Sequence, residues 1–399
     1  MIINPSEHTS ATRAFPRVIG HLKADAPGPT LVAIGGMHGN EPSGVYALQR
    51  LVDRLERESL LQKGEFIALT GNIRALENGQ RFIDTDLNRM WKFRPDLRGL
   101  AEVPEVYEAG EMEELQDHVD RAIEQRRGPL VFLDLHTTSA PSPPFILIGD
   151  TLRNRRFVQN LNLPVILGLE EQLNGPFLSY LNTKGHISMG FEAGQHEDEV
   201  SVENHYSLLL LILVQTGLLG AKDLPDLAAN RKRLAGQTTA ALKNFFEVRF
   251  RKPVHEGERF RMKPGYRNFQ PIQKDEALAH NQNGEVHAKE RGRIFMPLYQ
   301  EQGDDGFFII RRIAPFWLGF SVFLRYLRAH RALPILPGIR RVPGKDGLLI
   351  IHTNIVRWFG AQVLHLLGYR RRSHHEGKLL FIKREFDLHG PTSIDKFSE

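Results

Sequence analysis

Two histidines and one glutamate stand at positions from which their side chains could bind one metal ion. His38 and Glu41 are three residues apart in the stretch GGMHGNE, beside glycines that allow close approach of the backbone. His136 follows the apolar run LVFLDL. Two imidazoles and one carboxylate leave a fourth coordination position open for water, which is the pattern of a catalytic zinc site. We therefore predict that His38, Glu41 and His136 bind one zinc ion per chain.

Two further carboxylates fit the same chemistry. Asp134 lies two residues before His136, so on a strand its side chain faces the same way and can orient the imidazole. Glu192 follows the run HISMGF and stands where a general base is needed to move a proton from water to a leaving amine. Each residue also has an ordinary interpretation: H-x-x-E at a helix start is often a cap or surface pair, and a lone His or Glu after a strand is usually packed or solvated.

Short apolar runs predict the strands that must carry these residues. The runs are 17–24, 30–34, 65–70, 130–135, 145–148, 165–169 and 186–191. They alternate with helical patterns over 45–55, 112–123 and 202–218, which predicts a mixed or parallel α/β sheet with ligands beyond the carboxyl ends of the strands. Four candidate polar residues follow such ends closely: His38, Asn72, His136 and Glu192.

The rest of the chain predicts two smaller units. Alternation at 246–250 and the hairpin signal Asn283-Gly284 favour a small all-β domain over 246–315, after a catalytic domain over 1–245. Residues 316–399 form a basic, aromatic-rich, helix-containing extension with 14 Lys and Arg against 6 Asp and Glu, whereas the rest of the chain has 38 against 41.

The aromatic residues that open this extension admit two interpretations. They are interleaved with and followed by Arg325, Arg328 and Arg331, an arrangement that fits a helix on a membrane surface with basic anchors. Packing on the β domain, or a contact between copies of the chain, is the simpler alternative. The positive charges do not follow a recognisable nucleic-acid-binding module, so we expect no nucleic acid partner.

Composition limits the chemistry further. The chain has 399 residues, of which 41% are hydrophobic and 25% charged, as in an ordinary soluble protein. The absence of cysteine excludes disulfides, thiolate nucleophiles and Cys-ligated zinc. The N-terminal stretch MIINPSEHTSATR lacks the features of a signal peptide, so we expect a cytoplasmic protein. The apolar run 202–218 is interrupted by Glu203, His205 and Gln215, which favours a buried helix over a membrane span.

Five stretches, in this order, resemble the succinylglutamate desuccinylase/aspartoacylase family, whose members are relatives of zinc carboxypeptidases. They are GGMHGNE, GNIRAL, DTDLNRMW, LDLH and GFEAG, which together cover about residues 30–195. The resemblance implies a zinc-carboxypeptidase-like catalytic domain, zinc on the two histidines and Glu41, and Glu192 as base and acid. It also implies that Arg74 polarises the scissile carbonyl, and that Asn88 and Arg89 hold a substrate carboxylate, for which the arginine fork is well suited.

The sequence departs from the family pattern at one position. Aspartoacylases carry an arginine about ten residues before the catalytic glutamate, where it grips the second carboxylate of the substrate; here that position falls near Asn182. Lys184 is the candidate replacement, with a surface lysine as the alternative. Tyr299 is the candidate for a family tyrosine that closes over the substrate, although a tyrosine of this kind is more often packing. His196 and His205 lie near Glu192, where an ordinary helix or loop role is the simpler interpretation.

The sequence therefore predicts a zinc-dependent amidohydrolase that removes the acyl group from an N-acyl amino acid or a similar small carboxylated amide. Two alternatives stay open. One is a carboxypeptidase-type enzyme acting on peptides or cell-wall fragments. The other is a non-catalytic binding or membrane-associated protein on the same fold.

Overall fold

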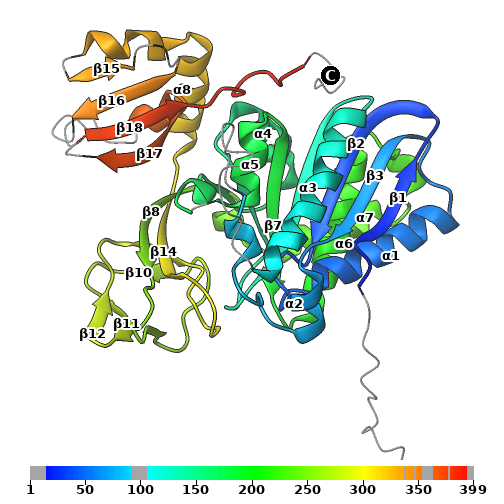
Figure 1. The fold of residues 1–399 in the computed structure, drawn as a ribbon, viewed down its shortest axis with the longest axis horizontal. Helices are drawn as coiled ribbons and strands as arrows, with labels where there is room; N and C mark the ends of the chain where they lie inside the picture. Colours follow the sequence, from blue (N-terminus) through cyan, green and yellow to red (C-terminus); the bar gives the residue numbers. More distant parts are fainter. Residues whose placement is uncertain are drawn as a thin grey trace, which may run out of the picture.

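A mixed sheet of eleven strands runs through the molecule in this computed structural model (Figure 1). The structure describes residues 15–91, 106–173, 175–336, 338–342, 344, 347–352, 363–375 and 378–392, so the expectation about the first 13 residues lies outside it. The strands, in sheet order, are β1 (Val18–Lys23), β3 (Lys63–Thr70), β2 (Ala26–Gly35), β4 (Leu130–Thr138), β7 (Ile187–Gln195), β5 (Phe145–Ile148), β6 (Val165–Leu167), β8 (Phe245–Pro253), β14 (Asp305–Arg312), β13 (Gly292–Phe295) and β10 (Pro271–Ile272).

The centre of this sheet is parallel. Strands β3, β2, β4 and β7 pair in parallel, whereas β1 and β5 run antiparallel to their neighbours β3 and β7. The predicted mixed α/β sheet is confirmed. Because β2, β4 and β7 are parallel, their carboxyl ends lie at one edge, where His38, His136 and Glu192 meet.

Helices cover both faces of the parallel part (Figure 1). The side chains of β2 alternate between the two cores: Leu31 and Ala33 pack with α1 and α6, whereas Val32 and Ile34 lie in the cluster that holds Leu115 of α3. The helices are α1 (Ser43–Arg57), α2 (Ile73–Asn78), α3 (Tyr107–Gln125), α4 (Leu152–Val158), α5 (Phe177–Thr183), α6 (Glu199–Gln215), α7 (Leu227–Gly236) and α8 (Pro315–Tyr326).

Helix α6 is the predicted apolar helix, and it is buried along most of its length. It packs against α1, α7 and β7, so its apolar residues belong to the largest core cluster. None of the helices that the structure describes combines the length and the apolar composition needed to cross a bilayer.

The main sheet continues past the boundary predicted at residue 245. Strand β8 begins at Phe245 and pairs in parallel with β6, and β14, β13 and β10 follow it in the same sheet. A separate three-stranded sheet contains β9 (Arg261–Met262), β11 (Ala277–Asn281) and β12 (Gly284–His287). The predicted Asn283-Gly284 hairpin is present between β11 and β12. Backbone pairing thus joins residues 246–312 to the catalytic sheet, and their independence as a small β domain stays a prediction.

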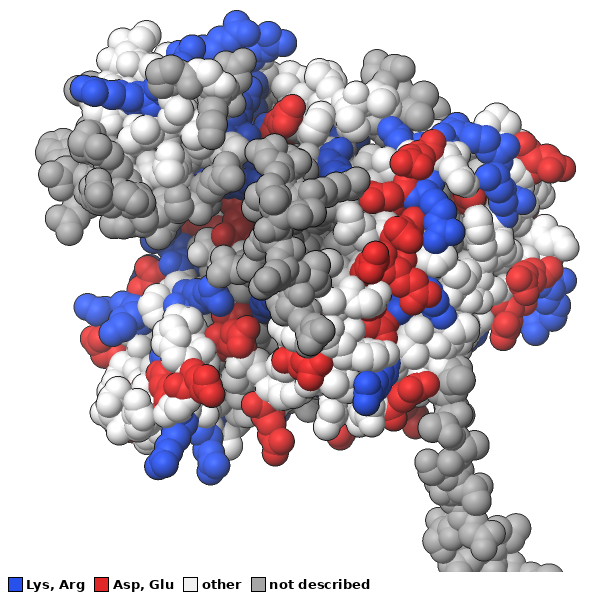
Figure 2. All heavy atoms as spheres, viewed as in Figure 1, with Lys and Arg blue, Asp and Glu red and all other residues white. Residues whose placement is uncertain are grey.

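The C-terminal extension contains a four-stranded antiparallel sheet as well as helix α8 (Figure 1). Its strands are β15 (Ile339–Arg341), β16 (Leu348–His352), β18 (Lys378–Lys383) and β17 (Tyr369–His375), and it has its own core cluster around Leu349 and Phe381. Figure 2 shows Lys and Arg side chains gathered over this part of the molecule, at the upper left.

One predicted surface anchor of α8 is wrong. The side chain of Arg325 is only 1% exposed: it pairs with Asp150 at 2.7 Å and with Asp387 at 3.0 Å, and it donates to the carbonyl of Leu366. The helix therefore presents Arg325 to the catalytic domain and its aromatic residues to solvent. Charge-assisted hydrogen bonds to two carboxylates replace the hydration that the guanidinium loses on burial. Arg328 and Arg331 are exposed, as predicted.

Candidate metal centre and catalytic site

The turn that carries His38 and Glu41 is built on glycines between β2 and α1. A Cβ on Gly35 would lie 2.7 Å from the backbone of Gly44 and Val45, and Gly36 has a φ of +71°. The backbone N–H of Glu41 donates to the carbonyl of His38 at 3.2 Å, which closes the turn before α1 begins at Ser43.

The other two residues come from adjacent strands. His136 lies within β4 and Glu192 within β7, and the two are register partners in the parallel pair. The strands extend past the predicted ends, because β4 continues to Thr138 and β7 to Gln195. His136 and Glu192 thus lie side by side near the carboxyl ends of their strands, as predicted.

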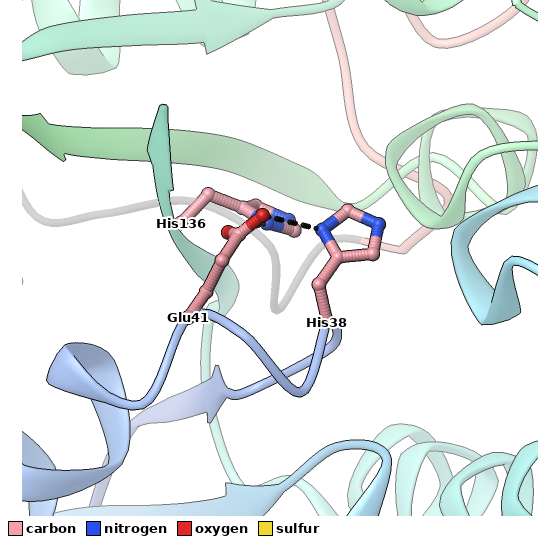
Figure 3. Close-up of side chains that lie close together, drawn as sticks. All are labelled: His38, Glu41 and His136. Atoms are coloured by element: carbon pink, nitrogen blue, oxygen red, sulfur yellow. Dashed lines mark hydrogen bonds and ion pairs between the residues drawn. The ribbon is translucent and has the colours of Figure 1, made fainter. Parts of the chain in front are cut away.

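The side chains of His38, Glu41 and His136 point toward one another (Figure 3). Oε1 of Glu41 lies 2.9 Å from Nδ1 of His38, and Oε2 lies 3.0 Å from Nδ1 of His136. One nitrogen or oxygen from each residue falls within 4.8 Å of the others, and all three side chains are buried. The donor set is that of a catalytic zinc site.

Two aspartates stand behind the histidines. Oδ1 of Asp86 lies 3.1 Å from Nε2 of His38, and Oδ2 of Asp134 lies 2.8 Å from Nε2 of His136. A carboxylate at the second ring nitrogen fixes the orientation of a metal-binding imidazole and raises its basicity. The prediction that Asp134 faces His136 is confirmed, whereas Asp86 was not identified from the sequence, although it stands in the polar stretch DTDLNRMW. The residues present therefore fit a divalent metal.

The charges of this cluster depend on one another. Burial works against the negative charge of Glu41, yet His38 and His136 hold the pKa of Glu41 well below its ordinary value. Burial works against a positive charge on His136, yet Asp134 and Glu41 raise the pKa of His136 well above its ordinary value. The cluster thus favours an ionised carboxylate beside positive charge.

Glu192 is the buried carboxylate with the opposite behaviour. Burial raises its pKa well above the ordinary value and Glu41 adds to this effect, whereas His136 and Arg81 oppose it. Its Oε2 atom is buried and has no hydrogen-bond partner among the described residues. A carboxyl group with a raised pKa next to a metal site can take up and release a proton near neutral pH.

Arg81 occupies the place that the sequence interpretation gave to Arg74. Nη1 of Arg81 lies 3.4 Å from Oε1 of Glu41, and Nη2 donates to Oδ2 of Asp86 at 3.1 Å. Arg74 is exposed on α2, with its guanidinium 4.9 Å from the ring centre of Tyr107, and it does not line the cavity. The predicted action of Arg74 on the scissile carbonyl thus finds no support in the cavity lining, and Arg81 is the better placed candidate.

The local structure explains why Arg81, and not Arg74, lies beside the metal cluster. The side chain of Asn72 accepts a hydrogen bond from the N–H of Ala75 and caps α2, so Arg74, at the second helical position, faces solvent. Gly79 ends the helix with a φ of +62°, and the chain then turns back and brings Arg81 to the metal cluster. The polar, weakly periodic stretch RFIDTDLNRMW was the signal in the sequence.

Asn88 and Arg89 line the cavity beside the cluster. Nδ2 of Asn88 lies 3.4 Å from Nε2 of His136, and its Oδ1 accepts from the N–H of Phe177. Arg89 donates to the carbonyl of Asn88 at 3.0 Å and lies 3.4 Å from Asp305. Both side chains are placed to meet a group bound in the cavity, and their binding of a substrate carboxylate stays a prediction.

Lys184 and Tyr299 do not line the cavity. Nζ of Lys184 pairs with Asp120 of α3 at 2.7 Å, because the residue ends α5 on the outer side of the helix. The hydroxyl of Tyr299 donates to the carbonyl of Lys263, while its neighbours Leu298 and Gln300 face the cavity. Side chains alternate along an extended segment, so Tyr299 points away. The predicted roles of Lys184 and Tyr299 in substrate binding therefore find no support in the cavity lining.

His196 and Gln300 form a second polar part of the cavity lining, of which the sequence indicated only the nearness of His196 to Glu192. Nε2 of His196 lies 2.9 Å from Oε1 of Gln300, and Nδ1 lies 2.8 Å from the hydroxyl of Thr137. Burial lowers the pKa of His196, which favours the neutral ring. Gln300 also accepts from Asn40 at 3.0 Å, so it joins the loop after β13 to the metal-binding turn.

These residues surround a cavity of about 130 Å³. Its polar lining includes the metal cluster, Arg81, Asn88, Arg89 and Glu192, and its apolar lining consists mainly of leucine, methionine and phenylalanine side chains. A site of this kind can bind a small molecule, polarise a carbonyl and transfer a proton.

Comparison with known proteins agrees with this geometry. Residues 27–207 match the family model described as succinylglutamate desuccinylase/aspartoacylase catalytic domain. The chain is 33% identical over 110 residues to a succinylglutamate desuccinylase of Pseudomonas paraeruginosa, an alignment that covers 28% of this chain and 31% of that protein. It is 30% identical over 203 residues to an aspartoacylase of Danio rerio, covering 45% of this chain and 58% of that protein. The chain thus spans less than two thirds of either relative.

Solved structures show the same fold. A succinylglutamate desuccinylase of Vibrio parahaemolyticus aligns with a TM-score of 0.51 at 14% identity, covering 73% of this chain and 83% of that chain. A succinylglutamate desuccinylase/aspartoacylase of Rhodobacter sphaeroides aligns with a TM-score of 0.53 at 16% identity, covering 73% and 88%. Residues 27–207 of this chain are thus similar to the catalytic domain of the succinylglutamate desuccinylase/aspartoacylase family.

Proposed function

We propose that this protein is a zinc-dependent amidohydrolase that deacylates an N-acyl amino acid or a similar small carboxylated amide. The observation that carries the proposal is the buried group of His38, Glu41 and His136, with Glu192 in register beside His136. The match of residues 27–207 to the family model supports amide deacylation as the reaction, and the donor set supports zinc as the metal.

In this proposal His38, Glu41 and His136 hold one zinc ion per chain. When bound, zinc supplies a Lewis acid for the amide carbonyl and lowers the pKa of water toward about 7. Asp86 and Asp134 orient the two imidazoles, and the N–H of Thr137 holds Oε2 of Glu41 at 3.0 Å.

The remaining steps belong to side chains of the cavity. Glu192 takes a proton from the attacking water and gives it to the nitrogen of the leaving amine, for which its raised pKa is suited. Arg81 places a fixed positive charge beside the site, where negative charge develops on the carbonyl oxygen. Arg89 and Asn88 hold the substrate carboxylate and so orient the amide.

A substrate panel tests this function. The full-length protein, loaded with zinc, is assayed with N-acetyl and N-succinyl amino acids, with and without a blocked α-carboxylate, and its metal content is measured by elemental analysis. We expect about one zinc per chain and hydrolysis that needs the free carboxylate. Cleavage restricted to peptides would favour a carboxypeptidase. The absence of both stoichiometric metal and hydrolysis would favour a non-catalytic protein.

We also propose that the C-terminal extension contacts a membrane surface. Helix α8 exposes a row of aromatic side chains that includes Phe316, which is 69% exposed, and Phe323, which is 57% exposed. The arginines Arg328, Arg331 and Arg340 are exposed nearby, and together these features suit an anionic lipid surface. Cytoplasmic localisation, like a contact between copies through this extension, is a proposal that comes from the sequence.

Flotation with liposomes tests the membrane contact. We expect the protein to float with vesicles that contain phosphatidylserine and to float less with Phe316→Ser/Phe323→Ser. The control is Arg249→Gln on β8, outside the C-terminal extension, and it should float like the wild type. No flotation combined with a dimer in solution would favour the contact between copies.

A further inference from the structure

The lining of the cavity beside the metal cluster also includes one buried acid and several apolar side chains. Leu147, Leu169, Leu178 and Phe308 form an apolar wall of this lining, and the acid is Glu170, in the 3-10 helix η3 (Leu169–Glu171) just after β6. Only 5% of Glu170 is exposed. Its Oε2 atom is buried without a hydrogen-bond partner among the described residues. A buried carboxyl oxygen without a partner in a residue that lines a cavity can accept a hydrogen bond from a ligand, because an unsatisfied buried polar atom is costly.

Arginines near Glu170 are already engaged elsewhere. The nearby Arg384 pairs with Glu171 through Nε at 3.1 Å rather than with Glu170. Burial raises the pKa of Glu170 to about 8, and the neighbouring Glu171 adds to this effect. A positive charge beside Glu170 would restore its ionised form.

The position that the family arginine would occupy lies close to this acid. A Cβ on Gly149 would lie 2.2 Å from Nδ2 of Asn182 and 2.8 Å from Oε1 of Glu170, so both side chains approach the same glycine. Asn182 is neutral and binds Asn154 and Ser188 through its Oδ1. Of these two residues, only Glu170 lines the cavity, and Asn182 lies behind it without a positive charge.

The cations that do line the cavity are held by acids at the other end. Arg81 is bound to Glu41 and Asp86, and Arg89 lies 3.4 Å from Asp305. Asp304 and Asp305 add further acids to the lining. A second substrate carboxylate at the Glu170 end would meet another acidic group rather than a cation, which gives it no compensation for losing water.

We infer that the substrate is an N-acyl derivative of a basic amino acid, whose aliphatic side chain lies along the leucines and whose terminal ammonium meets Glu170. This inference rests on the proposed function and names its substrate class. The α-carboxylate lies at Arg89, the acyl amide at the metal cluster, and the methylene groups cover the apolar wall. A purely apolar side chain would leave Glu170 unpaired, whereas a chain that ends in an ammonium satisfies both the leucines and the carboxylate.

The test compares substrates that differ only at the end of the side chain. The zinc-loaded, full-length protein is assayed with Nα-acetyl-ornithine, Nα-acetyl-lysine, N-acetyl-norleucine, N-acetyl-aspartate and N-acetyl-glutamate. We expect kcat/KM for one of the two basic substrates to exceed that for norleucine at least tenfold. A higher kcat/KM for the two acidic substrates than for the basic ones would overturn the inference and leave the proposed function standing.

Variants of Glu170 assign the preference to this residue. Glu170→Gln should abolish the preference for the basic substrate while changing kcat/KM for the norleucine substrate little. Glu170→Asp, which withdraws the carboxylate by one methylene, should shift the preference from ornithine toward lysine. Lys184→Gln, outside the cavity, is the matched control and should leave the preference unchanged. An unchanged preference in both Glu170 variants would overturn the inference.

Binding separates this inference from the proposed function. If no amide is hydrolysed, the proposed function fails, and calorimetry with free ornithine, lysine and norleucine then decides the inference. Tighter binding of a basic amino acid than of norleucine, lost in Glu170→Gln, would support a cation site at Glu170. Equal binding of all three would overturn it.

Discussion

Nη2 of Arg81 donates a hydrogen bond to Oδ2 of Asp86 over 3.1 Å, and the other oxygen of the same carboxylate lies 3.1 Å from Nε2 of His38. One aspartate thus connects a fixed positive charge to an imidazole of the candidate metal site. Burial lowers the pKa of Arg81, but Asp86 and Glu41 outweigh this effect and raise it, so the guanidinium stays charged in the site. The contact sets the position of Arg81 before any substrate binds.

Replacement of Arg81 should reduce catalysis, and replacement of Arg74 should not. We expect Arg81→Gln to lower kcat/KM about 10²- to 10³-fold, the loss typical of one group that stabilises a developing oxyanion. Arg74→Gln should stay within about twofold of the wild type, because exposed substitutions of this kind change little. Steady-state kinetics on the best N-acyl substrate measures both. A large loss in Arg74→Gln with little loss in Arg81→Gln would restore the assignment made from the sequence.

Glu192→Gln should keep the metal and lose turnover. The amide has the shape of the carboxyl group but cannot accept and return a proton, so we expect kcat to fall at least about 10²-fold. Elemental analysis should find the same zinc content as in the wild type, because Glu192 is not among the three clustered ligands. Turnover near the wild-type rate would remove Glu192 from the mechanism.

His205 should make the fold sensitive to acid. The ring is fully buried in α6 against Phe191, and burial lowers its pKa from 6.5 to about 3. The unfolded chain therefore binds a proton between these two pH values that the folded chain does not, so stability falls as pH decreases through this window. The slope approaches roughly 1.4 kcal/mol per pH unit.

The variant His205→Leu isolates this effect. Urea unfolding from pH 8 to pH 4 should show a smaller loss of stability in the variant than in the wild type, whereas above pH 7 the difference between the two should be constant. Parallel curves over the whole range would show that His205 does not carry the acid sensitivity.

Arg325 should hold the C-terminal extension to the catalytic domain. Its guanidinium pairs with Asp150 and Asp387, and burial opposes the charge of Asp150 while Arg155, Arg325 and Arg384 hold the pKa of Asp150 below its ordinary value. Removal of one member of a buried ion-pair cluster costs about 3–5 kcal/mol. We therefore expect Arg325→Met to lower the free energy of unfolding by that amount in chemical denaturation.

Arg331→Met is the matched control for Arg325→Met. Arg331 is an exposed arginine of the same extension, so its replacement should change stability by no more than about 0.5 kcal/mol. Equal effects of the two substitutions would mean that the buried cluster contributes nothing specific.

The sequence by itself determined the alternation of strands and helices, and with it the meeting of the metal-binding positions. Glycines beside His38, and the apolar runs before His136 and Glu192, are local features that fix where each side chain leaves its strand. Parallel strands then bring these residues to one edge, so a sequence pattern is sufficient to predict the cluster. The stretch around Asn88 and Arg89 was likewise recognisable as polar and irregular.

Only the tertiary structure decided which charged residues serve the cavity. The sequence interpretation chose Arg74, but the capped helix α2 directs that side chain to solvent, whereas the chain after α2 brings Arg81 to Glu41. Lys184, Tyr299 and Arg325 bind groups other than those predicted for them, namely Asp120, the carbonyl of Lys263 and Asp150. A charged group or hydroxyl binds the complementary group that the fold brings next to it. Those partners are distant in the sequence from the residues that bind them, so a local sequence pattern cannot predict the contacts. The same holds for the place of Glu170 in the cavity lining.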